Sequence, residues 1–178
     1  MKLNGKEKQE YITGVMIKAD KKTLFAMILS PYVSKNPFVA FSYKSIDTDK
    51  LILQYTNNYG ISKKIRAKFK EKKADLRLND SKYRLTTPQI AMNENAVPVH
   101  FSSTIALKSV SIYTLALDTA SRRFVAKFFI PSDAIVDFRF KIKMHHNGSV
   151  VQAIFEKEDG SSHTIENYVE YGSAVIDG

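Results

Sequence analysis

Apolar and polar residues alternate along most of the chain, and a period of two is typical of β-strands that bury one face. In the segment 135–144, Phe138, Phe140 and Ile142 fall on one face while Arg139 and Lys141 fall on the other. The first two predicted strands are separated by a short polar turn and should form a hairpin. Strands are predicted in the stretches 39–47, 50–57, 97–103, 105–118, 122–131, 135–144 and 149–159.

Two other segments favour helices. Asp20 is a candidate N-cap for the apolar run 21–30, and Pro31 follows where that helix would end. The segment 161–172 fits either a strand or a short helix capped by Ser162 or Thr164, and the helix is favoured. Just before the stretch 149–159, the dipeptide Asn147-Gly148 predicts a two-residue hairpin turn.

These elements predict a mostly β fold made of two small β-barrel or split-barrel units. One helix near the N-terminus and a short helix near the C-terminus would complete it. We place the boundary in the polar segment 78–84, which gives a basic, split-barrel-like domain over residues 1–79 and a β-barrel domain over residues 80–178.

Charge distinguishes these two halves. The 178 residues carry a net charge of +9, with 17 Lys and Arg against 7 Asp and Glu in residues 1–79, and 10 against 11 in residues 80–178. In the segment 61–78 the basic residues alternate with Ile65, Ala67 and Phe69, as on a strand whose solvated face discourages edge pairing. As a binding surface, this stripe would face an acidic protein partner. The predicted basic partner-binding face consists of Lys64, Arg66, Lys68, Lys70, Lys72 and Lys73.

The sequence lacks the common signatures of catalysis and metal binding. It contains no cysteine, and its four histidines do not follow the HExxH, HxH or HxxxH spacing that places two imidazoles on one metal ion. It also lacks phosphate-binding glycine loops and a serine nucleophile motif. We therefore predict a protein that is not an enzyme and holds no metal.

Nothing in the sequence predicts membrane insertion. The longest uncharged apolar segment near the N-terminus, residues 23–33, is too short to span a bilayer. The residues before it lack the order of charged, apolar and small residues that marks a signal peptide. We therefore predict a cytoplasmic location.

Two segments together resemble the start of a PilZ domain. Tyr83, Arg84 and Leu85, followed by Pro88, match an aromatic-Arg-aliphatic element that ends in proline, and Ser111 precedes the small apolar run 115–117 of the second element. The resemblance covers residues 80–171, and the preceding residues resemble a shortened form of the N-terminal barrel of flagellar-brake proteins. The sequence departs from the family at Asp80, Ser109 and Thr114, where the family has an arginine, an acid or amide, and a glycine.

The resemblance implies a non-catalytic adaptor or regulator that acts through protein–protein interaction. Cyclic di-GMP would be its only small ligand, with binding weak or lost, because an acid at position 80 would repel phosphate. The implied ligand-binding residues are Lys82, Arg84, Ser109 and Ser111.

Two alternatives remain open. In the first, a small β-barrel binds nucleic acid: the basic strand 63–73 follows the phosphate backbone, and Tyr43, Tyr55 and Tyr59 stack on bases. In the second, the chain is a component of a larger secretion, motility or phage assembly and docks through its basic half. The sequence leaves the oligomeric state open.

Overall fold

The computed structural model describes residues 9–33, 40–43, 50–67, 81–132 and 134–172, and these residues form strands and turns. The described part contains no helix, so the prediction of a mostly β fold is confirmed. The strands are β1 (Ile12–Ala19), β2 (Lys22–Leu29), β3 (Ala40–Tyr43), β4 (Leu51–Asn57), β5 (Ser62–Ala67), β6 (Tyr83–Thr86), β7 (Ile90–Ala91), β8 (Val97–Ser103), β9 (Ser109–Ala116), β10 (Arg122–Phe129), β11 (Ala134–Ile142), β12 (Ser149–Glu156) and β13 (Ser162–Tyr171).

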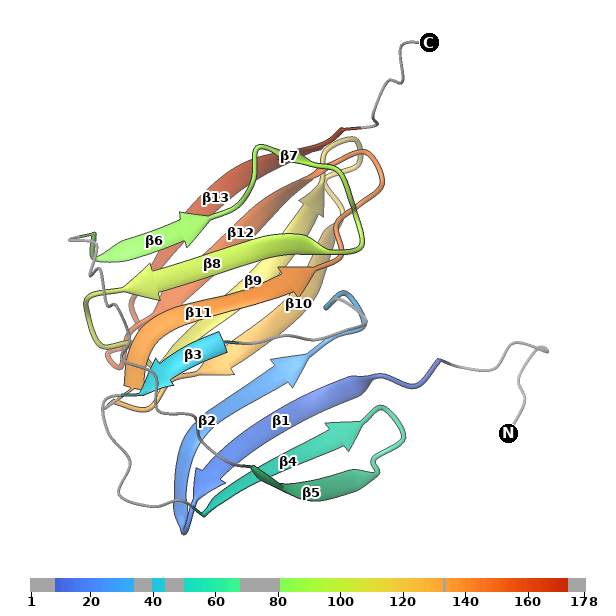
Figure 1. The fold of residues 1–178 in the computed structure, drawn as a ribbon. Helices are drawn as coiled ribbons and strands as arrows, with labels where there is room; N and C mark the ends of the chain where they lie inside the picture. Colours follow the sequence, from blue (N-terminus) through green and yellow to red (C-terminus); the bar gives the residue numbers. More distant parts are fainter. Residues whose placement is uncertain (1–8, 34–39, 44–49, 68–80, 133, 173–178) are drawn as a thin grey trace.

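The strands form two open sheets that face each other, rather than closed barrels (Figure 1). The large sheet has nine strands in the order β5-β4-β1-β2-β10-β9-β12-β13-β7, and the small sheet has four in the order β3-β11-β8-β6. Among the strands that the structure describes, every pairing is antiparallel except that of β13 with β7. The two layers therefore form a β-sandwich.

Aromatic side chains fill the space between the layers. Phe25 of β2 stacks on Phe138 of β11 with ring centroids 5.2 Å apart, and Phe101 of β8 meets Phe128 of β10 at 5.0 Å. All four side chains are almost completely buried. Such ring pairs contribute about 0.5–1.5 kcal/mol beyond the burial of their surface. The core thus ties β8 and β11 of the small sheet to β2 and β10 of the large one.

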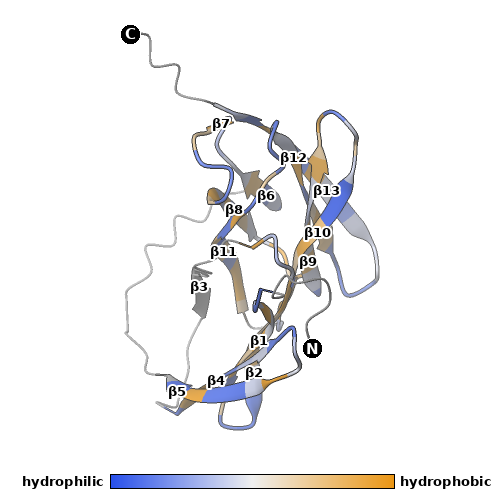
Figure 2. Ribbon diagram, turned by 90° about the vertical axis from the view of Figure 1, so that its right-hand side faces the viewer, coloured by the Kyte–Doolittle hydropathy of each residue, from blue (hydrophilic) through white to orange (hydrophobic). Residues whose placement is uncertain are grey.

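One side of the sandwich is closed and the other is not. On the closed side, the ring of Tyr83 lies 4.3 Å from that of His163, and Asn167 Nδ2 donates to the carbonyl of Leu85 at 3.0 Å, which ties β6 to β13. On the other side, β1, β4 and β5 extend beyond the four strands of the small sheet (Figures 1 and 2). We call these three strands the overhang.

The helix predicted over residues 21–30 is wrong, because these residues form strand β2. Asp20 is not an N-cap: it has a φ of 50° in the tight turn that joins β1 to β2. Strand β2 pairs with β1 on one side and β10 on the other. A segment that is apolar on both faces suits a central strand as well as a helix, and the pairing partners decide.

The favoured C-terminal helix is also wrong. Residues Ser162–Tyr171 form β13, which pairs with β12 along its length in register Glu156↔Ser162 to Ser149↔Val169. The turn before it contains Gly160 at a φ of 81°, a conformation that glycine adopts without a steric cost. This turn leads the chain directly back along β12.

Both predicted hairpins are wrong as well. Strand β3 pairs with β11 in the small sheet, whereas β4 pairs with β1 and β5 in the large sheet. The Asn147-Gly148 turn is present, with Gly148 at a φ of 97°, but it connects β11 of the small sheet to β12 of the large one. In both places two strands that are consecutive in the sequence belong to different layers instead of being neighbours in one sheet.

Over the part of the basic segment that the structure describes, the predicted strand is present as β5, but the expected half-buried face is wrong, because Ile65 is 51% exposed and its neighbours Lys64 and Arg66 are exposed as well. In β5, Ile65 stands opposite Leu53 of β4, while the neighbouring Lys64 and Arg66 stand opposite Gln54 and Ile52. Strand β5 is the first strand in the order of the large sheet, where lysines protect an edge. The remaining basic positions, Lys68, Lys70, Lys72 and Lys73, lie outside the described residues.

In the described residues, no helix is long and apolar enough to cross a membrane.

Candidate functional site

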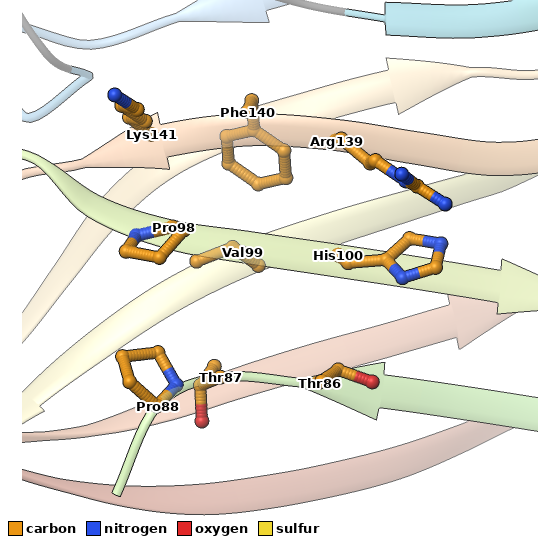
Figure 3. A pocket seen from close by; sticks show the side chains of 9 residues that line it. All are labelled: Thr86, Thr87, Pro88, Pro98, Val99, His100, Arg139, Phe140 and Lys141. Atoms are coloured by element: carbon orange, nitrogen blue, oxygen red, sulfur yellow. The ribbon is translucent and has the colours of Figure 1, made fainter. Parts of the chain in front are cut away.

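A pocket of about 400 Å³ lies on the small sheet, at the place where β6 leaves β8 (Figure 3). In the register of these strands Thr86 pairs with His100, so Pro88 and Pro98 would form the next pair on the same face. Neither proline has a backbone N–H, and two facing prolines cannot exchange ladder hydrogen bonds. The pairing ends here, and the divergence of the two strands opens the pocket.

The wall is built from three segments that lie side by side in Figure 3, namely the end of β6 with the two residues after it, β8 and β11, and each segment supplies three of the lining residues. Val99 and Phe140 are buried toward the core and form the floor, while Pro88 and Pro98 make the wall apolar. The lining residues are Thr86, Thr87, Pro88, Pro98, Val99, His100, Arg139, Phe140 and Lys141.

The polar side chains form a row across the strands. His100 lies between Thr86 on β6 and Arg139 on β11, opposite both in register. Its Nε2 lies 2.9 Å from Oδ1 of Asp137, and Arg139 Nε lies 3.9 Å from the same oxygen. Asp137 therefore holds the imidazole in place and partly balances the charge of Arg139.

Lys141 stands one row further along β11, opposite Pro98. In the described part of the chain no carboxylate lies within ion-pair distance of it, and the described residues that line the pocket include no acid. The pocket thus combines two cations, two threonine hydroxyls and an apolar wall. This combination suits an anion that also has a weakly hydrated part.

The structure separates the four predicted ligand residues into two pairs. Arg84 stands on β6 opposite Ser102, on the outer face of the small sheet, and Lys82 precedes that strand. Ser109 and Ser111 lie on β9, and their side chains are on the outer face of the large sheet, because Val110 between them points into the core. The two pairs therefore lie on opposite surfaces of the sandwich.

Ser109 has a partner of its own. Its Oγ donates to Oε2 of Glu156 at 3.0 Å, and Lys108 Nζ lies 3.3 Å from the other carboxylate oxygen. The hydrogen bond from Ser109, followed by the contacts with Lys108, lowers the pKa of Glu156 below its ordinary value. The hydroxyl of Ser109 thus belongs to a surface ion-pair cluster. Ligand binding by the four predicted residues stays a prediction.

Sequence reasoning did not identify the pocket. The alternation in 135–144 placed Arg139 and Lys141 on the polar face of a strand, but it gave no reason to join them to Thr86 and His100. The feature of the sequence that marks the pocket is a pair of prolines: Pro88 comes just after β6, and Pro98 lies near the start of β8. That these two prolines face each other can be recognised only when the register of β6 with β8 is known.

Among the residues described, no group of three or more His, Asp or Glu could hold a metal ion. Lys64 and Arg66 of the basic face are exposed on β5.

The fold defines the class of protein as a β-sandwich whose outer surface carries a small cationic pocket. The family follows from the sequence: the model described as sulfur oxidation protein SoxY matches residues 66–174, more than half of the chain, so the chain belongs to the SoxY family. A second model, described as sulphur oxidation protein SoxZ, matches residues 2–68. We call these two matched regions the SoxY-like segment and the SoxZ-like segment.

No curated protein matches the chain. Among solved structures, the superoxide reductase (neelaredoxin) from Ignicoccus hospitalis is similar, with 13% sequence identity and a TM-score of 0.45 over 51% of this chain and 80% of that one.

The family match corrects the predictions that rested on the PilZ resemblance. The chain matches SoxY and SoxZ, so the assignment to PilZ with a flagellar-brake-like barrel is wrong, and so is the role as a cyclic di-GMP adaptor. The acidic partner, the nucleic-acid partner and the secretion, motility or phage assembly are likewise not supported by these matches. The motif is not specific, because short barrel-like strands with an Arg after an aromatic residue recur in unrelated folds.

Proposed function

We propose that the chain is a non-catalytic component of a sulfur oxidation system, in which a SoxZ-like and a SoxY-like segment work as one adaptor or carrier. The family match to SoxY supports the sulfur oxidation role. The observation that carries the single-unit proposal is the pairing of β2, in the SoxZ-like segment, with β10, in the SoxY-like segment, from Leu29↔Ala126 to Ala26↔Phe129.

The small sheet supports the same proposal. Strand β3 of the SoxZ-like segment pairs with β11 of the SoxY-like segment, and the backbone N–H of Lys143 donates to the carbonyl of Tyr32 at 2.6 Å. Both layers thus contain strands from both segments. The division into residues 1–79 and 80–178 stays a proposal, and it describes how charge is distributed along the sequence.

The amino-acid composition bears on how these residues would carry a sulfur compound. Covalent attachment of a sulfur species needs a nucleophile such as a thiolate, and these 178 residues contain no cysteine. We therefore propose that these residues act by non-covalent contacts with a sulfur compound and with other sulfur oxidation proteins. The cytoplasmic location stays a prediction, which fractionation of the host cell would check.

The test compares a host strain that lacks the gene with the same strain after complementation. We expect deletion to reduce the consumption of thiosulfate, and the intact gene to restore it. The purified protein alone, given thiosulfate and an electron acceptor such as cytochrome c, should show no turnover. Unchanged sulfur oxidation in the deletion strain would contradict the pathway role, and turnover by the purified protein would contradict the non-catalytic role.

A further inference from the structure

We propose that the pocket between β6, β8 and β11 binds a sulfur oxyanion that has one weakly hydrated end, of which thiosulfate is the simplest example. The proposal rests on the proposed function for the choice of sulfur, and on the pocket itself for the kind of anion. It assigns a ligand site to Thr86, His100, Arg139 and Lys141.

The charge of the pocket favours an anion. Arg139 and Lys141 stand two residues apart on β11, and both side chains point away from the core, because Phe140 between them is buried. Asp137 is the nearest acid along the strand, and its Oδ1 lies closer to His100, at 2.9 Å, than to Arg139, at 3.9 Å. The positive charge of Lys141 is not balanced by a described carboxylate, so an anion would gain from both cations.

The donors suit a tetrahedral oxyanion. The guanidinium of Arg139 can donate two parallel hydrogen bonds to two oxygens, and the ammonium of Lys141, at the other end of the pocket, adds positive charge at longer range. The hydroxyls of Thr86 and Thr87 add donors from the opposite strand. In Figure 3, Thr86 and Arg139 lie at the same end of the pocket as His100, while Thr87 and Lys141 lie toward the prolines.

The apolar wall selects among oxyanions. Sulfate and phosphate are strongly hydrated on all sides, so contact with Pro88 and Pro98 would remove water without replacing it. The outer sulfur of thiosulfate is large and polarisable, and it loses less hydration against such a surface. We therefore expect thiosulfate to bind more tightly than sulfate, although both carry two negative charges.

The exposure of the site fits reversible binding. The side chain of Arg139 is 64% exposed, so the pocket opens directly to solvent. A ligand could enter and leave without movement of the backbone. This is the behaviour that non-covalent carriage requires.

The experiment is an NMR titration of ¹⁵N-labelled protein with sodium thiosulfate, with sodium sulfate in parallel at the same ionic strength to hold charge screening constant. We expect saturable shifts at the amides of Thr86, Thr87, His100, Arg139 and Lys141 with thiosulfate, and at least severalfold weaker binding of sulfate. The double variant R139Q/K141Q should weaken thiosulfate binding about ten- to hundredfold, as expected for the loss of the charge-assisted hydrogen bonds of Arg139 and of the nearby charge of Lys141.

Two controls keep the result interpretable. K64Q removes a positive charge from the exposed strand β5 of the large sheet, whereas the pocket lies on the small sheet, and should leave the affinity unchanged. The amide spectrum of R139Q/K141Q in the absence of ligand must match that of the wild type elsewhere, which shows that the variant is folded.

Absence of saturable shifts with thiosulfate would overturn the proposal, and so would equal binding of sulfate, which would indicate general attraction to positive charge. An equal loss of affinity in K64Q would do the same. None of these results affects the proposed function, because the deletion strain tests that separately. Conversely, thiosulfate binding at the pocket would stand even if the deletion strain oxidised sulfur normally.

Discussion

The covered part of the large sheet and the overhang are built from the same antiparallel pairings but bury their side chains differently. In β12, under the small sheet, buried and half-buried residues alternate along the whole strand, and Val151, Ala153 and Phe155 are completely buried. In β1, at the start of the overhang, the first seven residues are all half-buried. They include Val15 and Ile17, which are two residues apart and so lie on one face of the sheet. Hydrogen bonding alone does not create a core, and a second layer is needed to remove apolar surface from water.

The comparison places most of the stability under the small sheet, and the largest expected effect tests this directly. Phe101→Ala should lower the free energy of unfolding by about 3–5 kcal/mol, because the ring contacts four other phenylalanine rings and is completely buried. The measurement is urea unfolding followed by circular dichroism. The matched control is Phe129→Ala on the outer face of β10, where the side chain is 37% exposed and about 1 kcal/mol is expected. Equal losses would contradict the comparison.

The two turns that flank β12 each contain a glycine with a positive φ, and adding a Cβ atom to each compares a packed position with an open one. Gly148→Ala should destabilise the protein by about 3 kcal/mol, because a Cβ there would meet the carbonyl oxygen of Val169 at 2.8 Å and strain a φ of 97°. Gly160→Ala has a similar φ of 81° but open space around the new Cβ, so about 1 kcal/mol is expected. Thermal unfolding of both variants measures the difference. If the two variants lose the same stability, the close approach of Gly148 to the carbonyl oxygen of Val169 does not contribute to the cost of the substitution.

A buried histidine makes the covered end sensitive to acid. Desolvation, and then the charge of Arg123, lower the pKa of His145 below 6.5, against the opposing effects of its bond to the Thr114 backbone and of Asp118. Its Nε2 is buried without a partner among the described residues. A histidine with a lowered folded pKa takes up a proton more readily when unfolded, so its contribution to stability is complete above pH 6.5 and falls as the pH drops from there toward the folded pKa.

Urea midpoints measured between pH 8 and pH 5 check this expectation. The fall below pH 6.5 should be smaller in His145→Gln than in the wild type, since the other three histidines are unchanged. His163→Gln, on the exposed start of β13, serves as the matched control. An identical pH dependence in the wild type and in His145→Gln would contradict the assignment.

The smallest expected effect lies in the overhang. Ile65 is 51% exposed on β5, so Ile65→Ala should change the free energy of unfolding by less than about 1 kcal/mol. Urea unfolding at pH 7.5 measures it alongside Phe101→Ala. A loss comparable to that of Phe101→Ala would show that a further layer covers the overhang in solution.

The same contrast explains how much of the fold the sequence could predict. The strands of the covered region alternate clearly, and the stretches 97–103, 122–131 and 149–159 match β8, β10 and β12 closely. Strand β2 alternates poorly, because Leu24 and Phe25 are both buried on neighbouring positions near a register shift with β1. An amphipathic period is informative only where one face is wet and the other dry.

The pocket could not be predicted from the sequence because its residues come together only through strand pairing. Arg139 and His100 are far apart in the chain and meet because β11 and β8 are paired in register. The wrong hairpins show that even adjacent strands, such as β3 and β4, can belong to different layers. Local turn chemistry specifies a change of direction, but the choice of sheet depends on contacts between distant segments.

The pairing of β2 with β10 has a consequence for the order of synthesis. The apolar side chains of Phe25, Met27 and Leu29 leave the ribosome well before the strand that completes their edge of the sheet, which begins only at Arg122. Until then β2 can pair with β1 alone, and its free edge and apolar face are available to other chains. The nascent protein therefore has an unfinished edge while all the residues between β2 and β10 are made, and a cell that makes it in quantity would benefit from a chaperone that occupies this strand.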